Sequence, residues 1–153
     1  GMKAHAGVDA DSGLVHTVTA TAANAHDITQ AHALLHGQES DVFADSGYRG
    51  VQKREEILTR HPDVNWHIAM MPGKRKALKK DTAMGAMLDK LEQTKARIRA
   101  KVEHPFRVIK RQFGYAKVKY RGLAKNTANL LTLFALSNLW MVRKRLLNMG
   151  TQG

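Results

Sequence analysis

The first quarter of the chain alternates between apolar and polar residues in two short runs. Residues 3–8 and 14–21 are rich in Val, Ala and Thr, and the segment 9–13 between them supplies the residue types that favour a tight turn. This pattern predicts a β-hairpin. Apolar residues at helical spacing follow between Ile28 and Leu35, which predicts a short helix that ends before Gly37.

A brief apolar run at residues 41–44 leads into a glycine-bounded loop at residues 45–50, which indicates a buried strand followed by a turn. Asp45 is therefore expected at the C-terminal end of a strand. A polar helix is predicted around residues 52–60 and another strand at residues 64–70. The predicted order, two strands, a helix, a strand, a helix and a strand, is typical of an α/β fold.

Beyond Met84 the apolar residues recur at steps of three, four and seven, which predicts one buried helical stripe. Pro105 interrupts this stripe, so a kink or the first turn of a new helix is expected beside Glu103. Residues 126–147 are predicted to form a final helix, and the basic residues 143–145 are expected to suit the helix dipole in its last turns. The members of the stripe are Leu88, Leu91, Ile98, Val102, Phe106, Ile109 and Phe113.

The high positive charge of the chain indicates that this α/β protein binds an anionic partner. There are 25 Lys and Arg residues against 13 Asp and Glu, a net charge of +12 that folding does not require. DNA or RNA fits best, because cations that neutralise phosphates release condensed counterions; an anionic membrane surface or a ribosomal setting would give a similar balance.

Two absences narrow the chemistry further. The sequence has no cysteine, which excludes disulfide frameworks, thiolate zinc sites and cysteine nucleophiles and agrees with a cytoplasmic setting. The most apolar run, residues 130–142, contains polar residues and is shorter than the roughly 20 residues of a membrane span. We therefore expect no membrane insertion.

The basic residues concentrate in the second half of the chain. Between Lys95 and Lys125 there are 11 basic residues and one acid, Glu103, so this segment is suited to face phosphates. Glu103 lies four residues from both Arg99 and Arg107, and it is either their intrahelical ion-pair partner or an acid displayed among cations. The candidate DNA contacts are Arg49, Arg99, Arg107, Lys110, Arg111, Lys117, Lys119, Arg121 and Lys125.

Asp45 and Glu103 are the carboxylates best placed for metal chemistry. An aspartate at a strand end and an acidic helix residue offer the oxygen ligands that Mg²⁺ prefers, and two-metal phosphoryl transfer on DNA needs such carboxylates. Asp45 has an alternative role as a turn residue. Asp9 is a third candidate ligand, although its setting is that of a hairpin turn. His32 and His36 share helical spacing but lack the further ligand of a zinc enzyme.

One spacing in the basic segment resembles a known signature. Arg99-x3-Glu103-x6-Lys110 is similar to the last three positions of the Tyr-x2-Arg-x3-Glu-x6-Lys signature of bacterial insertion-sequence DDE transposases, with Ala96 in place of the tyrosine. The resemblance implies an RNase H-like catalytic domain, an α/β fold with a mixed sheet flanked by helices. It extends in the same order to residues 3–9, 21–27, 44–49 and 102–106, and so covers nearly the whole chain.

The resemblance implies that Asp45 is the second catalytic aspartate and Glu103 the final glutamate, both binding Mg²⁺ or Mn²⁺. Such enzymes carry the first aspartate on a strand before the hairpin, in an Asp-Ser/Ala-Thr sequence that is not found here. We therefore expect a single, partial catalytic domain that lacks the first strand. It would comprise a hairpin and β/α part at residues 1–72 and a mostly helical part at residues 73–153, and would be incomplete for catalysis alone.

The expected function is DNA transposition by Mg²⁺-dependent phosphodiester hydrolysis and strand transfer, acting on transposon ends and target DNA at the nucleoid. A non-catalytic basic DNA-binding module is one alternative. An RNase H-like nuclease that uses Asp9 as its missing ligand is another. The apolar final helix is expected to pack against the catalytic core, with a homodimer contact as the alternative.

Overall fold

The computed structural model describes residues 1–151. Its contacts group the chain into two compact units. The first, here called the hairpin unit, consists of Gly1–Ala25 and the chain from Lys101 onward; the second, the central unit, consists of His26–Ala100. Each unit is described by itself.

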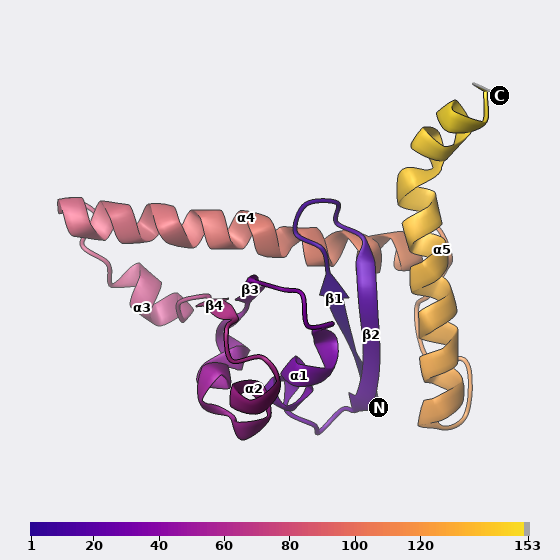
Figure 1. The fold of residues 1–153 in the computed structure, drawn as a ribbon, viewed down its shortest axis with the longest axis horizontal. Helices are drawn as coiled ribbons and strands as arrows, with labels where there is room; N and C mark the ends of the chain where they lie inside the picture. The colour runs from indigo at the N-terminus through magenta and orange to yellow at the C-terminus, as the bar shows by residue number, and fades with distance from the viewer. Residues whose placement is uncertain (152–153) are drawn as a thin grey trace. The chain divides into compact units, whose positions relative to one another are not determined.

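The hairpin unit contains the predicted β-hairpin. Strands β1 (Met2–Val8) and β2 (Val15–Ala22) pair antiparallel, with Met2 opposite Ala22, and lie side by side in Figure 1. The turn between them is closed by Asp9, whose backbone N–H donates to the Leu14 carbonyl at 2.9 Å. Alternation of side chains and a turn-forming segment, both local properties, predict this element from the sequence.

Helix α4 (Ala83–Arg111) continues through Pro105 as one helix, so the expectation of a new helix at the proline is wrong. Proline has no N–H to donate to the carbonyl four residues earlier, which weakens a helix interior. Packing offsets that loss here, since Pro105 and Ile109, one turn later, are both fully buried. The helix contributes its residues up to Ala100 to the central unit and the remainder to the hairpin unit.

Helix α5 (Leu123–Gly150) completes the core of the hairpin unit and runs beside β2 (Figure 1). Phe134 meets Phe106 of α4 edge to face, with 5.0 Å between ring centroids. The Asn138 side chain accepts a hydrogen bond from the Val15 N–H at 2.9 Å and donates one to the Val15 carbonyl at 2.7 Å. It thus satisfies both backbone groups of Val15, as the backbone of a neighbouring strand would. The face that α5 buries is made by Asn126, Leu130, Phe134 and Ser137, at steps of four, four and three.

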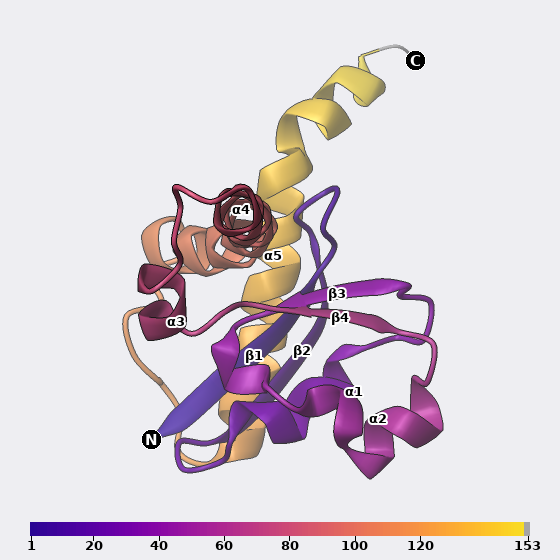
Figure 2. The ribbon, with the colours of Figure 1, turned by 90° about the vertical axis from the view of Figure 1, so that its left-hand side faces the viewer.

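The central unit is built around a parallel strand pair. Strands β3 (Asp41–Ala44) and β4 (Asn65–Ile68) lie side by side in Figure 2, with Ala44 opposite Ile68. The core beneath them consists of Ala31, Val51 and Ile57. The other elements are the 3-10 helices η1 (Asp27–Gln30), η2 (Ser46–Tyr48) and η3 (Val51–Lys53) and the α-helices α1 (Ala31–Leu34), α2 (Glu55–Arg60) and α3 (Pro72–Lys76).

The two units together confirm an α/β architecture. The strands of residues 1–151 form two pairs, one antiparallel and one parallel. A single RNase H-like mixed sheet stays a prediction, and so does one domain divided near residue 72. Among the described helices, none has the length and apolar character needed to cross a membrane.

Candidate functional site

Asp45 follows directly on β3, as predicted, and its side chain is exposed. Its Oδ1 accepts a hydrogen bond from the Gly47 N–H at 2.8 Å, and its backbone carbonyl accepts one from the Tyr48 N–H at 3.1 Å. The turn that was an alternative role for Asp45 is therefore present. Oδ2 accepts no hydrogen bond from residues 1–151, so the turn leaves one carboxylate oxygen open to a cation.

Tyr48 lies within the electrostatic range of two carboxylates of the central unit. Burial raises the pKa of Tyr48 to about 12, and the negative charges of Asp27 and Asp45 add to the rise. Asp27 begins η1, and its proximity to the same phenol as Asp45 is a product of the fold. In the sequence its only signal was its place at the end of the resembling segment 21–27.

A spectrophotometric titration is expected to show one of the three tyrosines ionising near pH 12 rather than near pH 10. A raised pKa in the folded state means that the neutral phenol stabilises the fold below pH 10, and this contribution is lost as the pH rises from 10 toward 12. Tyr48→Phe should remove the late step, whereas Tyr120→Phe, at an exposed residue, should keep it. A tyrosinate absorbance that is complete near pH 10 would contradict this assignment.

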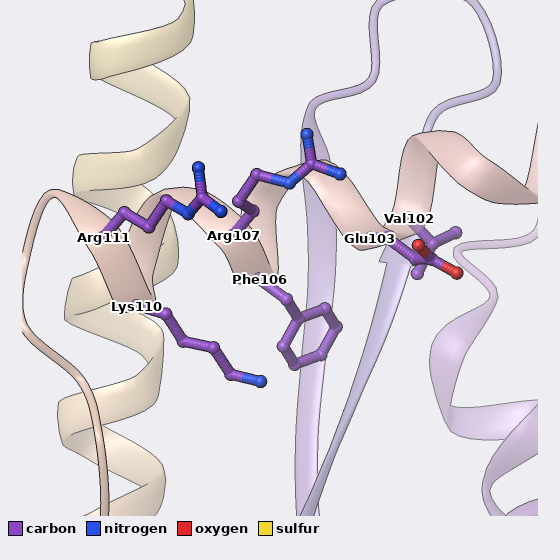
Figure 3. Close-up of a pocket in the computed structure, with 6 residues that line it drawn as sticks. All are labelled: Val102, Glu103, Phe106, Arg107, Lys110 and Arg111. Carbon is purple, nitrogen blue, oxygen red and sulfur yellow. The ribbon is translucent and has the colours of Figure 1, made fainter.

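Glu103 lies exposed on α4, within the hairpin unit. It makes no ion pair or hydrogen bond with residues 1–151, so the expected alternative, an intrahelical pair with Arg99 or Arg107, is not formed. Glu103 lines a surface depression of about 460 Å³ (Figure 3). The lining residues are Val102, Glu103, Phe106, Arg107, Lys110 and Arg111.

The cations of this depression extend to two sides of the helix. Figure 3 shows Arg107 and Arg111 extending to one side of α4 and Lys110 to the other. Guanidinium and ammonium groups bind phosphate oxygens, whereas an unpaired carboxylate is a suitable ligand for a hard divalent cation. This surface can therefore bind both components of a metal–phosphate complex.

Asp9 lies in the hairpin turn, as its setting predicted. The Ser12 hydroxyl and the Ser12 N–H, at 2.7 Å, both donate to Oδ2 and hold the pKa of Asp9 below its usual range. The turn is also attached to α4, because the Lys101 ammonium donates to the carbonyls of Ala10 and Asp11. A metal-binding role for Asp9 stays a prediction.

The remaining candidate DNA contacts lie mainly on the connection between α4 and α5. Asn126, 4% exposed, orders this connection: its side chain donates to the carbonyls of Tyr120 and Gly122, each at 2.7 Å, and accepts from the Tyr120 N–H at 3.2 Å. Arg49 belongs to the central unit, where its guanidinium contacts Met71, and Arg99 is half-buried on α4. The exposed set on or beside the connection is Lys117, Lys119, Arg121 and Lys125.

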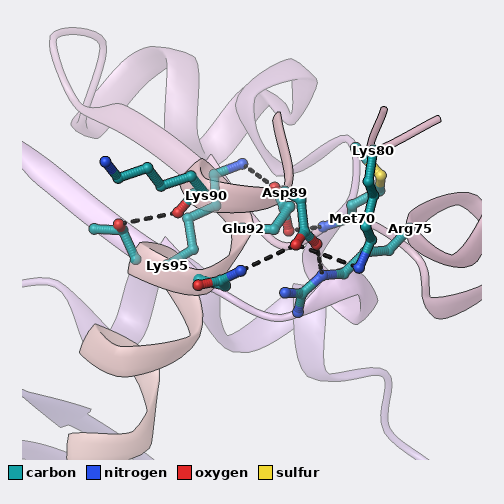
Figure 4. Close-up of polar contacts among 9 residues, drawn as sticks. Met70, Arg75, Lys80, Asp89, Lys90, Glu92 and Lys95 are labelled. Atoms are coloured by element: carbon teal, nitrogen blue, oxygen red, sulfur yellow. Dashed lines mark hydrogen bonds and ion pairs between the residues drawn. The ribbon is translucent and has the colours of Figure 1, made fainter. Parts of the chain in front are cut away.

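Two buried carboxylates on the first part of α4, Glu92 and Asp89, were not among the residues predicted from the sequence. Glu92, 5% exposed, accepts hydrogen bonds from the Lys95 ammonium and from the Met70 N–H, both at 2.8 Å (Figure 4). Lys95 also donates to the Ile68 carbonyl at 3.0 Å. Burial raises the pKa of Glu92, but these hydrogen bonds outweigh it and the pKa is lowered overall. The pair thus attaches α4 to the end of β4.

Asp89, the second of these carboxylates, is 8% exposed and binds two residues of the basic run at residues 74–80. Arg75 donates to it at 3.0 Å, Gln93 at 3.0 Å, and Lys80 forms an ion pair at 3.3 Å. The Arg75 hydrogen bond contributes most to the lowered pKa of Asp89. Leu91, which was predicted to belong to the buried stripe, is instead 50% exposed, because polar residues occupy the packed face of this part of α4.

No solved structure matches the chain. The family described as the transposase DDE domain matches residues 1–139, which include Asp45, Glu103 and the basic connection. The family that the motifs indicated is thereby confirmed. This chain belongs to the transposase DDE domain family.

Proposed function

We propose that this chain provides part of the catalytic surface of a DNA transposase, in which Asp45 and Glu103 bind Mg²⁺ or Mn²⁺. The observation that carries the proposal is the unpaired, exposed carboxylate of Glu103 in a segment where every other charged residue nearby is a cation. A surface selected only for solubility would gain more from pairing that carboxylate with Arg107 one turn away. Family membership supports the same assignment.

The residues around the two carboxylates have distinct tasks in this proposal. When bound, the metal ions activate the attacking oxygen and stabilise the leaving oxygen of a DNA phosphodiester. The Gly47 N–H fixes the orientation of Asp45 and leaves Oδ2 as its metal ligand. Arg107 and Lys110 bind the phosphates of the strand beside Glu103. Water and then a DNA 3′-hydroxyl are the attacking groups, and transposon ends and target DNA are the substrates.

Metal binding, rather than strand transfer, is the property to measure on this chain, because the sequence offers no Asp-Ser/Ala-Thr segment for the first aspartate. In a calorimetric Mn²⁺ titration, Asp45→Asn and Glu103→Gln should each weaken binding by at least about tenfold, since even partners outside a metal's ligand set cost this much. Asp63→Asn and Glu55→Gln, at exposed residues of the same types, should bind Mn²⁺ as the wild type does.

Wild-type Mn²⁺ affinity in both Asp45→Asn and Glu103→Gln would overturn the proposal. If DNA affinity also remained unchanged, the chain would be a non-catalytic basic DNA-binding module, the second function that its charge favours. Asp9→Asn tests the remaining alternative, because a loss of Mn²⁺ affinity there would make the turn carboxylate a ligand.

A further inference from the structure

A second surface depression, of about 440 Å³, lies in the hairpin unit between the β1–β2 turn, α4 and α5. Three guanidinium groups line it: Arg107 and Arg111, one turn apart on α4, and Arg143 on α5. Trp140 and His104 complete its basic and aromatic wall. Arg143 was not among the residues predicted to contact DNA.

No carboxylate compensates these three arginines. None of them forms an ion pair with an acid of residues 1–151, and the sequence from residue 104 to residue 153 contains no Asp or Glu. Glu103, the nearest acid along the chain, lines the neighbouring depression and not this one. Like charges that share a wall repel one another, so an anion bound between them stabilises the arrangement.

Arg143 is held in position by its own helix. Its guanidinium lies 3.9 Å from the centroid of the Trp140 ring, and one nitrogen donates to the Trp140 carbonyl at 2.6 Å. Stacking on an indole removes rotamer freedom from the arginine and leaves its other N–H groups available. The planar guanidinium is therefore pre-oriented to donate to two oxygens of one phosphate group.

The helix dipole does not explain Arg143. The sequence places the basic residues 143–145 in the last turns of the predicted helix, where the dipole would favour them. The structure shows that α5 continues to Gly150 and that its last turn contains no basic residue. Because the dipole acts only within the terminal turn, that interpretation is wrong. Of the basic residues 143–145, Arg143 alone lines the depression.

We propose that Arg107, Arg111 and Arg143 bind one phosphodiester of a DNA strand in this depression. Arg107 and Arg111 line both depressions, so a strand that passes Glu103 reaches Arg143 along a continuous basic wall. The inference rests on the proposed function in one respect, namely that DNA is the partner. It adds a DNA contact on α5, outside the segment that carries the transposase signature.

The test compares two variants that each remove one positive charge from α5. Arg143→Gln should weaken binding to a short fluorescein-labelled DNA duplex about fivefold at 0.1 M salt and lower the salt slope by about 0.9, the value for one lost phosphate contact. Arg145→Gln, whose side chain does not line the depression, should leave both quantities close to wild type. Equal losses in the two variants would overturn the proposal.

Trp140 supplies a readout within the site itself. Trp66→Phe makes Trp140 the only tryptophan. This substitution breaks no hydrogen bond of the indole, because the buried Trp66 N–H has no partner among the described residues. Duplex DNA should change the Trp140 fluorescence in this background, and Arg143→Gln should abolish the change. A signal that persists in Arg143→Gln would contradict the site, as would a wild-type chain that binds no DNA.

These measurements separate the two proposals. If Arg143→Gln and Arg145→Gln lose the same DNA affinity, the proposed contact on α5 is disproved. The proposal that Asp45 and Glu103 bind Mn²⁺ is not affected by that result. Conversely, failure of the Mn²⁺ titration does not alter what the Arg143 comparison shows about DNA.

Discussion

Replacing Lys117, Lys119 and Arg121 with glutamine is expected to weaken duplex DNA binding about a hundredfold at 0.1 M salt. All three side chains are exposed on the connection between α4 and α5, and no acid of the described chain pairs with them. Asn126 fixes the backbone at the end of this connection through Tyr120 and Gly122, on either side of Arg121. Fluorescence anisotropy over a range of salt concentrations should show a slope that is smaller by about 2.7, or 0.9 for each lost contact.

A matched triple variant exists in the central unit. Replacing Lys74, Lys76 and Lys79 with glutamine also lowers the net charge from +12 to +9, and all three are exposed. Arg75 and Lys80 of the same run are left in place because they pair with Asp89. This control should lose much less affinity than the variant of the connection. Equal losses would mean that total charge, and not the connection, governs DNA binding.

Features encoded by neighbouring residues could be predicted from the sequence. The hairpin follows from alternation and a turn segment, and Asp45 at the end of β3 follows from a short apolar run before a glycine-bounded loop. The exposure of Glu103 also agrees with its place among cations. In each case the sequence signal lies within a few positions, although the strands themselves pair with residues farther along the chain, as β3 does with β4.

Features decided by distant partners could not be predicted. Glu92 is buried because the Met70 N–H and Lys95 donate hydrogen bonds to its oxygens. The periodicity of α4 cannot show that Glu92 accepts a hydrogen bond from Met70, which lies 22 residues earlier in the chain. Pro105 stays helical because it and Ile109, one turn later, are fully buried in the hairpin unit. Propensity and spacing describe one element at a time, whereas tertiary packing can outweigh both.

Glu92→Ala is expected to destabilise the central unit by about 2 kcal/mol. The Glu92 and Lys95 side chains are only 6% and 15% exposed, so removing the carboxylate leaves a largely buried ammonium and the Met70 N–H without their acceptor. Since Lys95 also holds the Ile68 carbonyl beside Ala44, the strand that positions Asp45 loses support. Urea unfolding in a Trp140→Phe background measures this, because Trp66 in β4 then reports on the central unit alone.

The pH dependence distinguishes the charged pair from simple loss of packing. The lowered pKa of Glu92 means that its ionised form stabilises the fold above the ordinary value of 4.5, and that this stability is lost as the pH falls through the folded pKa. The difference between wild type and Glu92→Ala should therefore be largest at neutral pH and shrink in acid. Glu55→Ala, at an exposed residue of α2, should change the free energy of unfolding by less than about 0.5 kcal/mol, both in acid and at neutral pH. A Glu92→Ala deficit that is the same in acid and at neutral pH would show that packing, and not the ion pair with Lys95, attaches α4 to β4.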